Sequence, residues 1–175
     1  DRPFLDEVST DPGKMRIAFS YGGATGAECD GEHRRVLDET LNVLVNLGHD
    51  VEEADPPIVN DEMQDVFRTL MASNAAQTIR LHPTKGRLPQ EGEVERVVAA
   101  TAAKGEAVSG YDVFLAQGQM HAVGRRMATF HETYDVLMTP GLGHMPPRLG
   151  WLDMMMEDAD EYWDRVAAFS PYTVW

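Results

Sequence analysis

Two short segments typical of β-strands, separated by a helical segment, constrain the fold of this chain more than any other feature of its sequence. Met15–Ser20 alternates and is rich in β-forming residues, which predicts a strand, and His49–Ala54 predicts a second strand that Pro56 terminates. Asp30 is suited to cap the helix between them, and Gly48 is suited to end it. A strand, a helix and a strand over this length predict a βαβ unit, and therefore parallel strands.

The remainder of the chain predicts helices and one further strand. Ser109 followed by Asp112 resembles a capping box, and the helix after it has the clearest amphipathic pattern in the chain. A short apolar run over 135–139 predicts a third strand, and a last helix is expected from about Asp158 to Phe169. The apolar residues of the amphipathic helix recur three and four positions apart: Val113, Ala116, Met120, Val123, Met127 and Phe130.

These elements predict an α/β fold, a small sheet with one parallel βαβ unit and a large helical insertion. The expected organisation is a linker over 1–14, the βαβ unit over 15–59, the helical insertion over 60–133, and a strand, loop and final helix over 134–175.

Composition excludes several classes of partner. The net charge of −14 argues against nucleic acid and against an anionic membrane surface, because both require clustered Lys and Arg. No apolar run approaches the roughly 20 residues of a membrane span. The single cysteine, Cys29, cannot form an intrachain disulfide. We therefore expect a cytoplasmic protein without nucleic-acid or membrane partners.

Both ends of the chain suggest a segment of a larger protein. The chain begins at Asp1 and ends in the uncharged, aromatic-rich stretch Phe169–Trp175, whereas natural termini are usually polar. Three strands with a large insertion also make a poor sheet by themselves. Such a segment is expected to expose apolar surface and to self-associate, for example as a homodimer.

A Gly-rich turn, Tyr21–Gly26, follows the first strand as a dinucleotide-binding loop would. Its spacing does not fit, because the first Gly of Gly-x-Gly-x-x-Gly would fall at Tyr21, and the helix begins too late to meet a pyrophosphate. A mobile surface loop is the expected alternative.

Metal binding finds little support in the sequence. None of the six histidines forms a His-x-x-x-His pair, and one cysteine cannot build a structural zinc site. An acidic group at the start of the last helix complements the helix dipole, with a calcium site as the alternative. This group comprises Glu157, Asp158, Asp160 and Glu161.

Motifs for nucleophilic catalysis are also missing. No serine lies in a Gly-x-Ser-x-Gly or Ser-x-x-Lys context. Lys14, Lys85 and Lys104 fall in loops or at a helix end, whereas a catalytic lysine must be desolvated to lose its proton near neutral pH.

Several stretches, in order along nearly the whole chain, resemble the C-terminal region of amidase-signature enzymes. They are Arg2–Val8, Pro12–Ala18, Leu47–Ala54, Tyr134–Pro140 and Ala168–Thr173. The resemblance implies a mixed sheet surrounded by helices. It also implies hydrolysis of a small-molecule carboxylic amide by a Ser–cis-Ser–Lys triad, without a metal or organic cofactor. In the family the triad lies in a Gly/Ser-rich core upstream of the matched region, so no catalytic residue is assigned to this chain.

The resemblance implies a substrate-side role for the loop after the third strand. The candidate substrate-binding residues are Thr139, Pro140, Gly141, Leu142 and His144. An ordinary strand-to-loop transition is the alternative for these positions. The predicted function is the C-terminal part of an amidase, and a glutamine amidohydrolase subunit of a transamidating complex is an alternative within the family. A non-catalytic α/β ligand- or partner-binding module is the alternative from another class.

Overall fold

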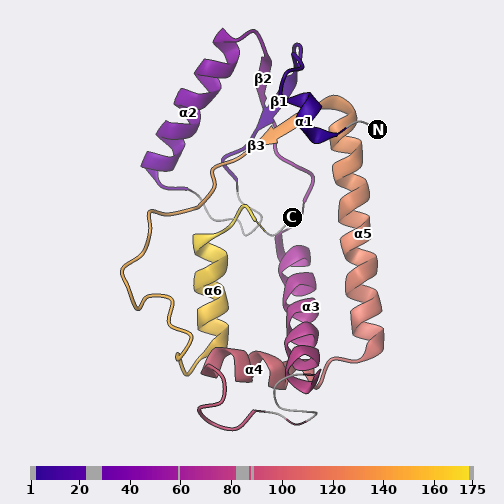
Figure 1. Ribbon diagram of the computed structural model, residues 1–175, viewed down its shortest axis with the longest axis vertical. Coiled ribbons are helices and arrows are strands. Elements are labelled where there is room, and N and C mark those ends of the chain that lie inside the picture. Colours follow the sequence, from indigo (N-terminus) through magenta and orange to yellow (C-terminus); the bar gives the residue numbers. More distant parts are fainter. Residues whose placement is uncertain (1–2, 23–28, 59, 82–86, 88, 174–175) are drawn as a thin grey trace.

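The computed structural model describes residues 3–22, 29–58, 60–81, 87 and 89–173. A small sheet with one helix beside it occupies one end of the molecule, and the other long helices extend away from it (Figure 1). The elements in chain order are α1 (Phe4–Glu7), β1 (Arg16–Phe19), α2 (Gly31–Asn46), β2 (Asp50–Glu53), α3 (Asn60–Leu81), α4 (Arg96–Gly105), α5 (Gly110–Thr133), β3 (Val136–Met138) and α6 (Ala159–Phe169).

The sheet has the strand order β2–β1–β3, and both pairs of neighbouring strands are parallel. Ile17 in the central strand lies opposite Val51 on one side and Val136 on the other. Ile17 and Ala18 are almost completely buried, so the centre of the sheet contributes to the core. The predicted α/β fold and parallel βαβ unit are confirmed, and each observed strand is one residue shorter at either end than expected.

Local capping explains the bounds of α2. The Asp30 carboxylate accepts a hydrogen bond from the backbone N–H of His33, and Gly48 ends the helix with a φ of 97° that favours glycine. Leu37 and Leu41, one turn apart, are the buried residues of this helix. Both predicted caps are therefore confirmed.

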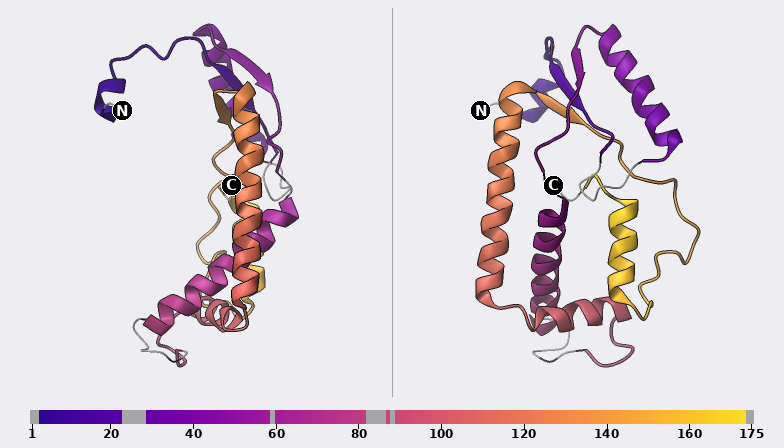
Figure 2. Two further views of the ribbon diagram at one scale, coloured as in Figure 1. Left: turned by 90° about the vertical axis from the view of Figure 1, so that its right-hand side faces the viewer. Right: turned by 180° about the vertical axis from the view of Figure 1, so that it is seen from behind.

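The helical layer consists of α3, α5 and α6, which run along the length of the molecule, and α4, which crosses the end far from the sheet (Figures 1 and 2). The helix α3 contacts both α4 and α5. Met63, Val66 and Ile79 of α3 are buried together with Val97 of α4, so this part of the chain has its own apolar core.

The amphipathic pattern of α5 is only partly buried. The Ser109–Asp112 capping box begins the helix as expected, but among the six apolar residues of the pattern only Ala116 and Val123 are buried. Tyr111 and Phe114 are 74% and 77% exposed. The helix α5 packs along α3, and the other four apolar residues of the pattern remain half-buried or exposed.

The segment expected to be a linker contains the one-turn helix α1. Pro3 precedes it, and Asp6 and Glu7 place negative charge in its only turn, which stabilises a helix start. Phe4 is 92% exposed, and α1 stands away from the rest of the molecule in the side view (Figure 2).

The crossing of α3 and α4 requires glycine at position 105. A Cβ atom at Gly105 would lie 2.0 Å from the carbonyl oxygen of Ala72. We expect Gly105→Ala to destabilise the chain by about 1–3 kcal/mol, because the two backbones must separate. Gly118→Ala is the matched control, since a Cβ at Gly118 meets no atom within 4 Å, and it should stabilise by roughly 0.5–1 kcal/mol. Urea unfolding measures the free energy of unfolding of each variant. Equal changes in the two variants would contradict the need for glycine where α3 and α4 cross.

Candidate functional site

The carboxyl ends of the three parallel strands meet at one edge of the sheet. In open α/β sheets ligands bind in the crevice outside this edge. Three segments lie here: Ser20–Gly22 after β1, Ala54–Asp55 after β2, and the loop that starts at Thr139 after β3. Groups at this edge are therefore the candidates for contact with a substrate.

A buried serine lies at the edge. Ser20 has no exposed surface, its Oγ donates to Oδ1 of Asp55 at 2.5 Å, and it accepts from the N–H of Gly22 at 3.1 Å. The pair fastens the segment after β1 to the segment after β2. Sequence motifs did not reveal it, because 35 positions separate the two residues.

Neither described lysine lies beside a serine hydroxyl. Lys14 pairs with Asp50, at the amino end of β2, and Lys104 pairs with Asp160. Lys85 lies outside the described residues. A hydroxyl activated by a neutral lysine, which the resemblance requires for catalysis, is therefore not found in the part of the chain that the structure describes.

The loop after β3 is fixed at Gly143. The carbonyl of Gly143 accepts from the N–H of Asp30 at 2.8 Å, and its N–H donates to the carbonyl of Phe169 at 3.0 Å. A Cβ at position 143 would lie 2.8 Å from the carbonyl oxygen of Ala168 and 3.2 Å from Pro171. Only glycine fits this junction without displacement, so the loop has a defined path between α2 and α6.

A hollow of about 360 Å³ lies between this loop and the first turns of α2. Thr139, Pro140 and Gly141 line it, so the structure brings three of the five candidate residues together. Leu142 is half-buried and His144 is exposed, and neither lines this hollow. The remaining lining residues are Met145 of the loop and Glu32, His33, Val36 and Leu37 of α2.

The carboxylate of Asp30 holds together two walls of the hollow, the first turn of α2 and the loop after β3. It accepts from the backbone N–H and ring Nδ1 of His33 and from the N–H of Met145, and these bonds lower the pKa of Asp30 to about 2. The positive end of the α2 dipole thus already has a negative partner. The carboxylate of Glu32 lines the hollow itself, so an anion is disfavoured there.

The metal-binding and dinucleotide-binding alternatives weighed from the sequence receive little support from the described residues. Among the described residues no group of three or more His, Cys, Asp or Glu side chains could hold a metal ion. In the acidic group at α6, Asp158 caps the helix and Asp160 pairs with Arg68 and Lys104. The Gly-rich turn lies mostly outside the described residues. No helix in the described part is both long and apolar enough to cross a membrane.

Comparison with known proteins identifies the family of the chain. The family model described as "Amidase" matches residues 1–174, and the chain belongs to the amidase-signature family. A Synechocystis sp. protein named "Putative amidase" is 24% identical over 161 residues, which cover 90% of this chain and 29% of that protein. "Putative amidase AmiC" of Mycobacterium leprae is 27% identical over 169 residues, or 94% of this chain and 35% of that protein.

Two solved structures share the fold. The 6-aminohexanoate cyclic dimer hydrolase superposes with a TM-score of 0.75 at 21% identity, covering 87% of this chain and 32% of that one. A bacterial aryl acylamidase of the amidase-signature family superposes with a TM-score of 0.68 at 18% identity, covering 96% and 37%. The chain thus spans about a third of the length of the relatives that it matches. The family resemblance inferred from sequence is confirmed.

The charge of Asp30 should make stability depend on pH in a defined direction. Its pKa falls from an ordinary 3.8 to about 2 in the folded chain, so the carboxylate stabilises the fold above about pH 4 and loses this effect as the pH falls toward 2. We expect Asp30→Asn to lower the melting temperature at pH 7. Near pH 2 the melting temperatures of the variant and of the unmodified chain should become nearly equal. Glu95→Gln is the control, because Glu95 precedes α4 but its side chain makes no capping hydrogen bond. A similar fall in melting temperature in this variant would contradict the stabilising role of the Asp30 carboxylate.

Proposed function

We propose that this chain is the C-terminal part of an amidase that hydrolyses carboxylic amide C–N bonds, and that the attacking serine and its lysine belong to sequence outside these 175 residues. The observation that carries the proposal is the extent of the match. The family model matches residues 1–174, yet the chain corresponds to only about a third of each relative. In agreement with this, the described residues contain no serine hydrogen-bonded to lysine.

The chemistry of amide hydrolysis explains why the chain would be incomplete alone. A serine hydroxyl is a weak nucleophile until a neighbouring base removes its proton, and the tetrahedral intermediate needs N–H donors for its oxyanion. The hydroxyl of Ser20 instead donates to Asp55 in a buried contact that holds two loops together. We assign Ser20 a structural role on this ground.

The contribution proposed for this chain is the substrate side of the active site. Thr139, Pro140 and Gly141 would form part of the mouth, with Leu142 and His144 on the same loop. The fixed path of the loop at Gly143 supports this role, since a rigid wall orients a substrate without an added entropic cost. The Glu32 carboxylate, which lines the hollow, favours an uncharged amide over an anion as the bound group.

The isolated chain should therefore hydrolyse neither aryl nor aliphatic amides, and it should release no ammonia from glutamine. Acetanilide, hexanamide and glutamine are suitable probes, with aniline and ammonia as the measured products. Ser20→Ala serves as the control for trace activity. Turnover by a contaminating enzyme persists in this variant, whereas turnover that Ser20→Ala abolishes would place the nucleophile in this chain and refute the proposal.

A free-standing, non-catalytic module would behave differently in solution. Tyr111, Phe114 and Leu115 on α5 are 74%, 77% and 49% exposed, which favours a segment that packs against further polypeptide. We expect concentration-dependent self-association in light scattering, and Phe114→Glu should reduce it. Leu149→Glu, at a fully exposed loop position, is the matched control. A strictly monomeric chain with a sharp cooperative melt would instead favour the module.

A further inference from the structure

The helix α5 forms one lateral edge of the molecule, and its outer side is turned away from α3 (Figures 1 and 2). Ala116 and Val123 are buried on the inner side. On the outer side Tyr111 and Phe114 are 74% and 77% exposed. Five residues that recur three or four positions apart follow this outer side. We call them the α5 outer stripe: Tyr111, Phe114, Gly118, Ala122 and Arg125.

The middle of α5 carries no full charge on any side. No Asp, Glu, Lys or Arg occurs over 113–124, whereas these residues make up 25% of the whole chain. The solvent-facing side of a helix in a globular protein normally carries charged and polar residues. Exposed aromatic rings beside an uncharged stretch are typical of an interface.

Gly118 lies at the centre of the α5 outer stripe without a reason inside the described chain. A glycine within a helix costs roughly 1 kcal/mol relative to alanine. An added Cβ at Gly118 meets no atom within 4 Å, so no close contact within the described residues requires glycine there. A missing side chain on a helix surface lets a second helix approach closely, because the side chains at the contact set the distance between the axes.

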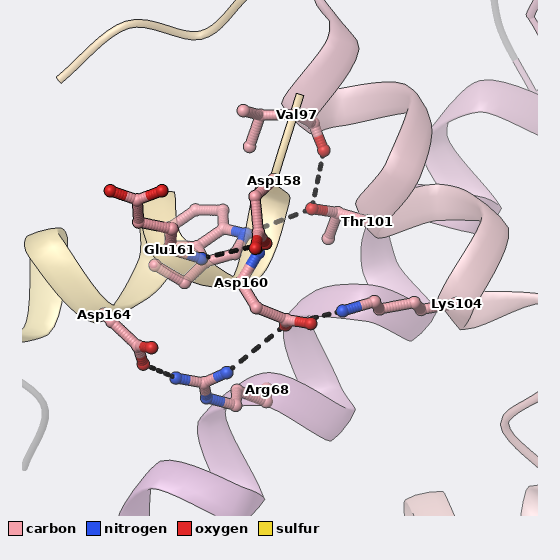
Figure 3. Close-up of polar contacts among 9 residues, drawn as sticks. Arg68, Val97, Thr101, Lys104, Asp158, Asp160, Glu161 and Asp164 are labelled. Atoms are coloured by element: carbon pink, nitrogen blue, oxygen red, sulfur yellow. Dashed lines mark hydrogen bonds and ion pairs between the residues drawn. The ribbon is translucent and has the colours of Figure 1, made fainter. Parts of the chain in front are cut away.

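The opposite edge of the helical layer has a different character. Arg68 contacts Asp164 at 2.6 Å, and Lys104 contacts Asp160 at 2.5 Å (Figure 3). A partner that docked against α6 would displace these ion pairs, whereas the uncharged middle of α5 has none to lose. The outer side of α5 is therefore the better surface for a partner.

The α5 outer stripe is complementary to itself. When two copies of α5 lie antiparallel with a two-fold axis at Gly118, residues equally far before and after Gly118 lie level with each other. Phe114 of one copy then lies over Ala122 of the other, so a bulky side chain meets a small one. Tyr111 lies level with Arg125, and a guanidinium over an aromatic ring is a favourable contact. The two Gly118 residues face each other, where the backbones come closest.

We propose that two copies of this chain pair through the α5 outer stripe, antiparallel and with the two-fold axis at Gly118. The symmetry of the stripe selects a second copy, because a segment of another sequence would need no such symmetry about Gly118. This inference does not depend on the amidase assignment. The net charge of −14 makes the copies repel each other, and an uncharged contact surface adds least to this repulsion.

The pairing is weak and reversible. The α5 outer stripe is about 21 Å long, from the rise of a helix over its residues. One helix from each copy over this length makes a small interface, and we expect a Kd on the order of 10 μM. Added salt should lower the Kd, because it screens the repulsion between the acidic copies. Weaker pairing at higher salt would contradict an uncharged interface.

Single cysteines test the register of the pair. Cys29→Ser removes the natural thiol, and Gly118→Cys in that chain should form a disulfide-linked dimer with diamide as oxidant, because the two-fold axis brings the thiols together. Ala122→Cys should not link to itself, since its two copies lie about 12 Å apart along the axes. A mixture of Ala122→Cys and Phe114→Cys should link, because the second Phe114–Ala122 contact of the pair stays intact. Non-reducing gels measure the products. Equal linking of all variants, or none by Gly118→Cys, would overturn the proposal.

A substitution at the axis tests the close approach of the two helices. Gly118→Leu should raise the Kd about tenfold or more in sedimentation equilibrium, because the added side chains keep the backbones apart, while the melting curve stays cooperative. Gly124→Leu is the matched control, since Gly124 also meets no atom within 4 Å but lies beside the α5 outer stripe, and it should pair like the unmodified chain. Equal Kd values for the two variants would exclude the α5 outer stripe.

Concentration separates this pairing from the other predictions. The unfolding of Gly118→Ala is measured well below the Kd, where the chain is monomeric and the added methyl group acts on the helix alone. A chain that remains monomeric at about ten times the expected Kd would refute the pairing and leave the amidase proposal standing. Hydrolysis abolished by Ser20→Ala would refute the amidase proposal and leave the pairing.

Discussion

The junction at Gly143 is the contact on which the arrangement of the two layers depends. Its carbonyl binds the N–H that begins α2, and its own N–H binds the carbonyl that ends α6. The sheet layer and the helical layer are thereby joined by two backbone hydrogen bonds as well as by the chain that runs between them. Because backbone groups make both bonds, the junction tolerates changes in most neighbouring side chains but not a Cβ at Gly143 itself.

The Asp30 carboxylate strengthens the same junction from the side of α2. One oxygen caps the helix at His33, and the other accepts from the N–H of Met145 in the loop. A residue that local sequence identifies only as a helix cap therefore also holds the loop after β3. This one side chain thus joins two segments that lie 115 positions apart in the sequence, and the hollow beside Thr139 lies between them.

Features encoded within a few residues could be predicted from the sequence. The caps at Asp30, Gly48 and Ser109 are local, and so both ends of α2 and the start of α5 follow from residue type and spacing. The parallel pairing of β1 and β2 followed from the order of a strand, a helix and a strand, since parallel neighbours require a long crossover and usually have a helix in it.

Contacts between distant residues could not be predicted in this way. The Ser20–Asp55 pair, the close approach at Gly143 and the bond from Trp163 to Thr101 each join segments that tertiary folding brings together. The periodicity of α5 shows the same limit. It marks an apolar face correctly, but which members are buried depends on how much of that face α3 covers.

The C-terminal end of α6 ties the helical layer to the sheet edge at two further points. Pro171, which follows the helix, lies against Gly143, and the hydroxyl of the buried Tyr172 donates to the carbonyl of Tyr21 after β1. Because these contacts join the end of α6 to the loop after β3 and to the segment after β1, the path of the chain after α6 is set by the same edge of the sheet that carries the hollow at Thr139.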